Sequence, residues 1–129
     1  MNTPSNLKYT KTHEWVLIEN NIATEGITDF AQSELSDIAF VELPEAGRKV
    51  AQGEAMGTIE AVKAVSDLVA ALSGEIIEVN ETLKNSPDKI NTSAFGEGWI
   101  VKIKISNPDE AKNLMNADEY AKHCEESHH

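Results

Sequence analysis

The sequence lacks most of the features that would place it outside an aqueous, reducing environment. Its 129 residues include one cysteine, Cys124, so no internal disulfide bond can form. No stretch approaches the roughly 18–20 consecutive apolar residues that a membrane-spanning helix requires, so we expect no membrane partner. Residues 1–6 have neither an apolar signal core nor the Arg- and Ser-rich character of a transit peptide. These absences predict a cytoplasmic, bacterial protein; a mature mitochondrial form is the less favoured interpretation.

Basic side chains are also scarce. Lys and Arg together number 11 against 22 for Asp and Glu, which gives a formal net charge of −11 at pH 7. An acidic chain repels phosphate backbones, so we expect no nucleic-acid partner. The excess negative charge either maintains solubility or lets the chain dock on basic surfaces around the active sites of partner enzymes. Both interpretations stay open.

Groups that could catalyse a reaction or hold a metal are missing from the sequence. His13 and His123 have no metal-ligand spacing to a cysteine, so no metal site is predicted. Cys124 lies in a polar tail without a neighbour that would activate its thiol. The terminal His128-His129 pair is interpreted as a solvated end. With no nucleophile–base pair in evidence, an enzyme is not predicted.

The most informative stretch runs from Gly57 to Gly74. It is almost entirely small or apolar and contains one basic residue, Lys63. Its apolar residues recur at helical spacing, which slightly favours a helix. A β-hairpin with Lys63 at its tip also fits, because β-branched residues flank the tip and glycines punctuate both ends. Periodicity alone leaves both structures open.

Short β-prone runs, separated by turn-forming residues, make up much of the chain. Asn20-Asn21 is predicted to form a tight turn between the first two strands. The clearest alternation is at 99–105, where the odd-numbered residues are expected to be buried, while Ile100 and the two lysines face water. The predicted strands span residues 15–19, 22–26, 38–43, 75–79 and 99–105.

Helices are predicted mainly from their capping residues. Thr28 or Asp29 would cap a short helix over 30–35. Asn107, followed by Pro108 and Glu110, begins one C-terminal helix, and the Asn116-Ala-Asp-Glu119 spacing begins another. Both should pack on the β-strands, since neither is long enough to stand alone. Residues 80–98 are predicted to form a long loop with one helical turn.

Short strands with Gly and Pro punctuation are typical of a β-sandwich or barrel. At 129 residues we expect one domain over 1–129, with a core from about 7 to 120 and a polar tail over 121–129.

Six blocks of this sequence resemble, in the same order, the H protein of the glycine cleavage system. Residues 60–67, Glu60-Ala-Val-Lys63-Ala-Val-Ser-Asp67, resemble the family's lipoyl-attachment segment, where the lysine lies at a hairpin tip and carries lipoate in amide linkage. The other blocks are residues 13–16, 26–32, 40–44, 73–80 and 96–99, and residues 117–120 resemble the family's ending. The sequence departs from the family at Ala61, often Ser there, and at 93–95, which replace a usual Asp/Ser-Pro-Tyr.

The resemblance implies a fold and a function. The fold would be mainly β: the lipoyl-type flattened β-sandwich (barrel-sandwich hybrid), with short peripheral helices that include a C-terminal one. The function would be that of a non-catalytic carrier in glycine breakdown. Lipoate on Lys63 would accept an aminomethyl group from glycine decarboxylase, a pyridoxal-phosphate enzyme, and deliver it to the tetrahydrofolate-dependent aminomethyltransferase. The flavin enzyme dihydrolipoyl dehydrogenase would then reoxidise the arm, and a lipoyl or octanoyl ligase or transferase would install it.

Other residues in the matching blocks are candidates for protecting the loaded arm. A cationic amine in a cleft calls for carboxylates or hydroxyls, and Glu14, Asp67 and Thr12 fit that need. The alternative is that both acids are ordinary surface acids or caps. Glu60 is a candidate for recognition by the ligase; a hairpin ion pair to Lys63 is the alternative.

Several other functions are weighed against the carrier. A biotin carrier usually has Met on both sides of its lysine, where this chain has Val62 and Ala64. The lipoyl domain of a 2-oxoacid dehydrogenase usually has Asp before the lysine and a linker to a catalytic core. H-like proteins that relay lipoyl or octanoyl groups to other enzymes, and an unmodified acidic interaction module, remain as alternatives.

Overall fold

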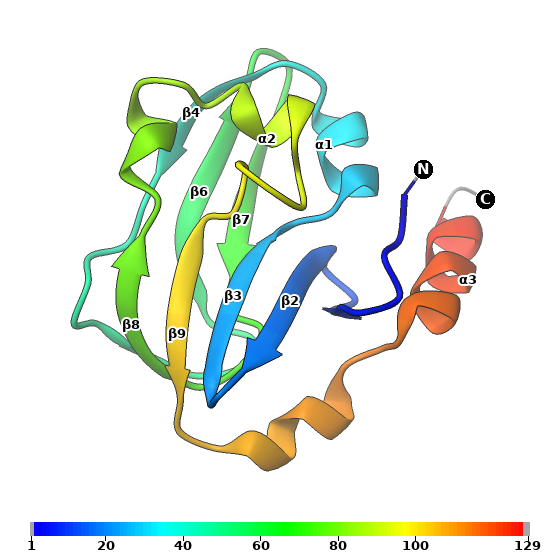
Figure 1. Ribbon diagram of the computed structural model, residues 1–129. Coiled ribbons are helices and arrows are strands. Elements are labelled where there is room, and N and C mark those ends of the chain that lie inside the picture. Colours follow the sequence, from blue (N-terminus) through cyan, green and yellow to red (C-terminus); the bar gives the residue numbers. More distant parts are fainter. Residues whose placement is uncertain (1, 128–129) are drawn as a thin grey trace.

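The computed structural model describes residues 2–127, which form two antiparallel sheets edged by short helices (Figure 1). The larger sheet contains, in order, β1 (Lys8–Tyr9), β2 (Glu14–Glu19), β3 (Ile22–Ile27), β9 (Val101–Ile105), β8 (Gly74–Val79) and β5 (Lys49–Val50). The smaller sheet contains β4 (Ile38–Glu42), β6 (Ala55–Ala61) and β7 (Val65–Val69), with β6 in the centre. The prediction of a mainly β sandwich with short peripheral helices is confirmed. The two-residue strands β1 and β5 were not predicted.

The stretch in which a helix competed with a hairpin is a β-hairpin. Strands β6 and β7 pair from Ala55 opposite Val69 to Glu60 opposite Val65, with an irregularity between Ala55 and Gly57. A Cβ atom added at Gly57 would lie 2.4 Å from the Glu42 carbonyl oxygen of the neighbouring strand, so only glycine fits there. The helical spacing was misleading because it does not follow burial: Ile59 is buried, whereas Val62 and Val65, which share its helical spacing, are exposed at the hairpin end.

The Asn20-Asn21 turn is confirmed. Both residues have positive φ, 49° and 66°, as the central residues of a type I′ hairpin turn require. The strands that it joins pair without a break, from Glu19 opposite Ile22 to Glu14 opposite Ile27. This unbroken register decides which side chains of β2 and β3 point into the interior.

The first helix, α1 (Asp29–Leu35), begins as predicted. Thr28 is its cap, since its hydroxyl accepts the N–H of Ala31 at 3.2 Å. The region expected to be a loop with one helical turn instead contains two short helices, η1 (Glu81–Lys84) and α2 (Lys89–Thr92).

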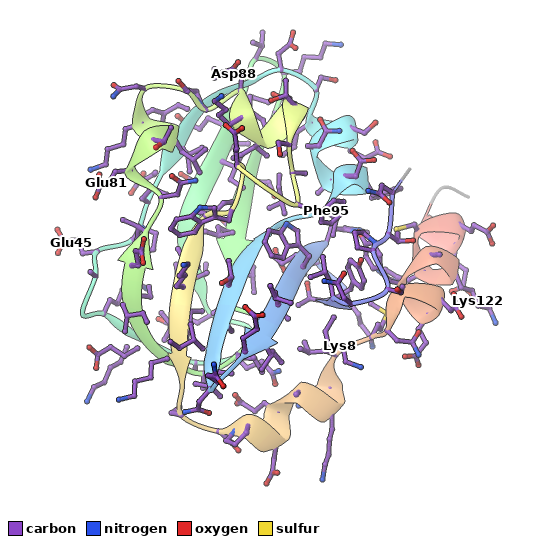
Figure 2. The ribbon with its side chains drawn as sticks, in the orientation of Figure 1. Lys8, Glu45, Glu81, Asp88, Phe95 and Lys122 are labelled. Carbon is purple, nitrogen blue, oxygen red and sulfur yellow. The ribbon has the colours of Figure 1, made fainter. Side chains whose placement is uncertain are left out.

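The C-terminal segment forms η2 (Pro108–Asn113) and α3 (Ala117–Ser127). Asn116 and Glu119 cap α3 reciprocally: each side chain accepts the other residue's backbone N–H. The predicted polar tail needs correction. Residues 121–127 continue α3, which lies beside the N-terminal segment with Lys122 on its outer side (Figures 1 and 2). His128-His129 lies outside the described residues.

Two hydrophobic clusters hold these elements together. The larger one fills the space between the sheets, and the smaller one joins the N-terminal segment to α3 through Tyr9, Trp15, Tyr120 and Cys124. Cys124 is therefore buried rather than part of a polar tail. Ile100 is also buried, against the prediction, because β9 begins one residue later. None of the helices in residues 2–127 is long and apolar enough to cross a membrane.

Candidate functional site

Lys63 lies at the exposed tip of the β6–β7 hairpin, at the top of the view in Figure 1. Its neighbour Val62 is 76% exposed although it is apolar. The backbone of the tip is nevertheless held in place: the Ala61 N–H donates to the Ala64 carbonyl at 2.7 Å, and the Val62 N–H donates to the Asp37 carbonyl at 3.0 Å. The structure thus presents an accessible lysine on a backbone of defined shape.

The outer face of the small sheet continues from this tip. Phe40, Glu60 and Val65 lie in one row across the three strands, and Glu42, Thr58 and Asp67 lie in the next. Phe40 is 48% exposed and Val65 is 64% exposed. Exposed apolar side chains therefore lie among carboxylates beside Lys63, a composition typical of a binding surface. Ion pairs among the described residues include none between Glu60 and Lys63.

Glu14, at the start of β2, is not a surface acid. It is 1% exposed, and its Oε1 atom accepts hydrogen bonds from the hydroxyls of Thr10 and Thr12. Burial raises the pKa of Glu14 to about 7, against the opposing effect of these two hydroxyls. Its ionisation is thus poised near neutrality, and Thr12 is its direct partner.

A surface cleft of about 280 Å³ adjoins Glu14. Its walls include Thr10, Thr12, Gln52, Val69, Ala71 and Leu114. The two threonines that line the cleft are those that bind Glu14, so the carboxyl lies directly behind the cleft wall. Asp67 is elsewhere: it is exposed, on the outer face of the small sheet. The structure brings Thr12 and Glu14 together and leaves Asp67 apart.

A second buried carboxyl, Glu25, was missed in the sequence. It is 0% exposed, its Oε1 accepts the Ala71 N–H at 2.9 Å, and its Oε2 has no hydrogen-bond partner among residues 2–127. The signal that could have revealed it is its place in β3, where it alternates with the apolar residues Ala23 and Ile27. Acidic side chains are rarely found on the core side of a strand, because burying a carboxyl group without hydrogen-bond partners costs free energy.

The loop that departs from the expected family pattern packs on the large sheet. The Trp15 indole donates its Nε1–H to the Ala94 carbonyl at 2.9 Å, and its ring lies 6.0 Å from that of Phe95, which Figure 2 shows next to the sheet. The departure at 93–95 therefore leaves Lys63 and the cleft untouched. Among residues 2–127, no group of three or more His, Cys, Asp or Glu side chains is placed to hold a metal ion.

Comparisons with known proteins agree with this geometry. A family model described as "Glycine cleavage H-protein" matches residues 7–127. The glycine cleavage system H protein of Symbiobacterium thermophilum is 52% identical over 119 residues, 92% of this chain and 93% of that protein. The probable glycine cleavage system H protein of Aeropyrum pernix is 54% identical over 114 residues, 88% of this chain and 80% of that protein.

A solved structure extends the likeness to three dimensions. The crystal structure of a glycine cleavage system H protein from Mycobacterium marinum superposes with a TM-score of 0.84 at 37% identity and covers 92% of this chain and 96% of its own. Sequence and structure matches thus span nearly all of the chain. It belongs to the glycine cleavage H-protein family.

Proposed function

We propose that this chain is the non-catalytic lipoyl carrier of a glycine cleavage system, with lipoate bound through an amide to Lys63. The observation that carries the proposal is an exposed lysine on a hairpin tip fixed by two backbone hydrogen bonds, in a chain of this family. When bound, lipoate supplies the dithiolane that takes up the aminomethyl group and gives it to tetrahydrofolate on the aminomethyltransferase. The protein's own residues present that arm and shelter its end.

The hairpin tip and the adjoining outer face of the small sheet would present Lys63 to the ligase and to the partner enzymes. An acylating ligase needs the Lys63 amine in solution, and the fixed tip gives it a constant shape to recognise, with Glu60 in the adjacent row. Phe40, Val62 and Val65 supply an apolar centre for docking, and the carboxylates around them favour partners whose active-site mouths are basic. Glycine decarboxylase, the aminomethyltransferase and dihydrolipoyl dehydrogenase would all use this end. A tethered arm raises the effective concentration at each of them without tight docking.

The cleft beside Thr12 and Glu14 would shelter the loaded end of the arm from water. Lys63 lies in the turn two residues before β7, and Val69 ends β7 at the cleft, so the two are at most about 20 Å apart at roughly 3.3 Å per residue. An arm laid back along β7 would pass Asp67 and place its amine toward Glu14. A carboxylate with hydroxyl neighbours in a half-closed site binds an ammonium group more strongly than the same groups in water.

The remaining assignments follow from this role. We place residues 1–129 in one lipoyl-carrier domain that works in the cytoplasm of a bacterium. The chain itself would catalyse no step of the glycine reaction; its contribution is carriage and protection.

The test is the variant Lys63→Arg, which keeps charge and fold but removes the amine that is acylated. After co-expression with a lipoyl ligase, intact mass and peptide mapping should show a lipoyl increment on Lys63 in the parent protein and complete loss of it in the variant. Glycine decarboxylation supported by the carrier should fall to background. Lys84→Arg, at an exposed lysine paired with Glu81, is the matched control and should behave like the parent. Normal activity of Lys63→Arg would reject the carrier function.

A further inference from the structure

Glu14 and Glu25 form a pair of buried carboxyls on one face of the large sheet. In the β2–β3 register Glu14 lies opposite Ile27, and Glu25 lies opposite Val16. The two acids are therefore diagonal neighbours on the interior face, where such positions are about 7–8 Å apart. Both are shielded from water, with exposures of 1% and 0%. Two negative charges in this position would repel one another strongly.

The hydrogen bonds of the two carboxyls are unequal. Glu14 accepts both threonine hydroxyls on its Oε1 atom. Glu25 accepts one N–H on Oε1, and no group of the described part of the chain donates to its Oε2. A buried anionic oxygen without a donor is costly, whereas a protonated one carries no charge to satisfy. The surroundings thus suit the ionised form of Glu14 and the neutral form of Glu25.

The same cleft wall connects the pair to the proposed arm site. Thr10 and Thr12, which bind Glu14, and Ala71, which binds Glu25, all line the cleft of about 280 Å³. Glu14 is separated from the cleft by hydroxyl side chains, and Glu25 is separated from it by one peptide group. A change of charge on either carboxyl acts on whatever occupies that cleft.

We propose that Glu25 is a positioning residue that keeps its proton on Oε2, so that Glu14 alone carries the single negative charge directed at the cleft. One charge matches the one ammonium group that the loaded arm would bring. The functional part of this inference rests on the proposed carrier role; the order in which the two carboxyls lose their protons does not.

The other groups around the pair support this order of ionisation. Burial raises the pKa of Glu25 well above its ordinary range, and the neighbouring Glu14 raises it further; for Glu14, burial raises the pKa only to about 7. Tyr120 of α3 also interacts electrostatically with Glu14, and Lys11 lines the cleft. Ala71 presents its backbone amide to Glu25, and β9 presents the apolar Val101 opposite Glu25. Glu14 is thus the first of the two acids to ionise.

The first experiment is an NMR titration of the side-chain carboxyl carbons in the full chain without lipoate, labelled with ¹³C-glutamate. Glu14 should titrate near pH 7 and should lose its proton before Glu25 does. Glu25→Gln replaces one neutral group by another and should move the Glu14 midpoint by less than about half a pH unit, whereas Glu14→Gln should lower the Glu25 midpoint. A Glu25 signal that titrates with or below that of Glu14 would overturn the proposal.

The second experiment tests positioning, on the lipoylated protein with an amine-loaded arm. The ammonium should lower the Glu14 midpoint by about one pH unit or more, equally in the parent and in Glu25→Gln. Glu25→Leu, which removes the acceptor of the Ala71 N–H, should lose this shift, and recovery by the glutamine variant separates positioning from general damage. An unmoved Glu14 midpoint on a loaded arm rejects the positioning role. Failure of the carrier function would instead appear as an unmodified Lys63 in the mass spectrum.

Discussion

The hairpin tip and the buried carboxyl pair lie toward opposite ends of strand β7 and are built in opposite ways. At the tip, apolar and charged side chains face water, and only backbone hydrogen bonds fix the shape. At the pair, two acids are withdrawn from water and fixed by hydroxyl and amide donors. In the function proposed above, partner enzymes would reach the tip, and the pair would lie where water is excluded. The comparison teaches that one short strand can join an exposed apolar surface to a buried polar one.

The largest expected effect concerns the buried carboxyl pair and is a change of the free energy of unfolding with pH. Because burial raises the pKa of Glu14 from 4.5 to about 7, the folded state holds a proton that the unfolded state has lost between these values. The free energy of unfolding should therefore be highest below pH 4.5 and fall as pH rises to 7, by about 3 kcal/mol from this residue. Glu14→Gln should lack the part of the fall that Glu14 contributes and keep the part that comes from Glu25, whose pKa is also raised.

Urea denaturation of the parent and Glu14→Gln at several values between pH 4.5 and 8 measures the difference. Glu19, an exposed acid at the far end of β2, provides the control Glu19→Gln, which should follow the parent. Parallel curves for the parent and Glu14→Gln would mean that Glu14 titrates as an ordinary acid.

The role of the hairpin's shape can be tested at Gly57, in the strand that leads to the tip. In Gly57→Ala the new methyl carbon would lie 2.4 Å from the Glu42 carbonyl oxygen, so β4 and β6 must separate. We expect a loss of about 1–3 kcal/mol in unfolding free energy, together with slower lipoylation of Lys63 by a ligase. Thr58→Ala, at the next position on β6, should change both less. If lipoylation of Gly57→Ala keeps its parent rate, the ligase does not depend on the shape of the tip.

The smallest expected effects are on the hydrolysis rate of the amine-loaded arm, and they should distinguish Glu14 from Asp67. Glu14→Ala removes a charged hydrogen-bond acceptor behind the cleft, worth about 1.5 kcal/mol, and should speed hydrolysis of the amine-loaded arm about tenfold. Asp67→Ala, at an exposed site, should change it by less than about threefold. Ammonia release from the loaded carrier measures both rates. Equal rates for the two variants would place the amine on the outer face of β7 rather than in the cleft.

Local chemistry explains which parts of the fold could be predicted. The Asn20-Asn21 turn and the Asn116/Glu119 cap depend on residues within three positions of each other, and both were found. The strand from Val101 was visible through its alternation. Lys63 was proposed as the attachment site through a resemblance in sequence blocks, since periodicity alone left its backbone undecided.

What was missed depends on contacts between distant segments. The partner of Glu25 is 46 residues away at Ala71, and β5 exists only because β8 pairs with it. The sequence predicted a solvated Cys124, but the structure buries it because α3 packs on the N-terminal segment. In that contact the rings of Tyr9 and Tyr120 stack with centroids 4.6 Å apart. Glu14 was chosen for its chemistry, but its burial could not be predicted from its neighbours in the sequence. Such features need the tertiary structure.

The hydrogen bond from the Val62 N–H to the Asp37 carbonyl has a practical consequence for any attempt to transfer the proposed attachment site to another protein. A short peptide tag that copies residues 55–69 would contain Lys63 and both of its strands. It would lack the carbonyl that secures the tip and the β4 strand that supports β6. The unit that can be transplanted as an acylation handle is therefore the hairpin together with β4 and the residues just before it.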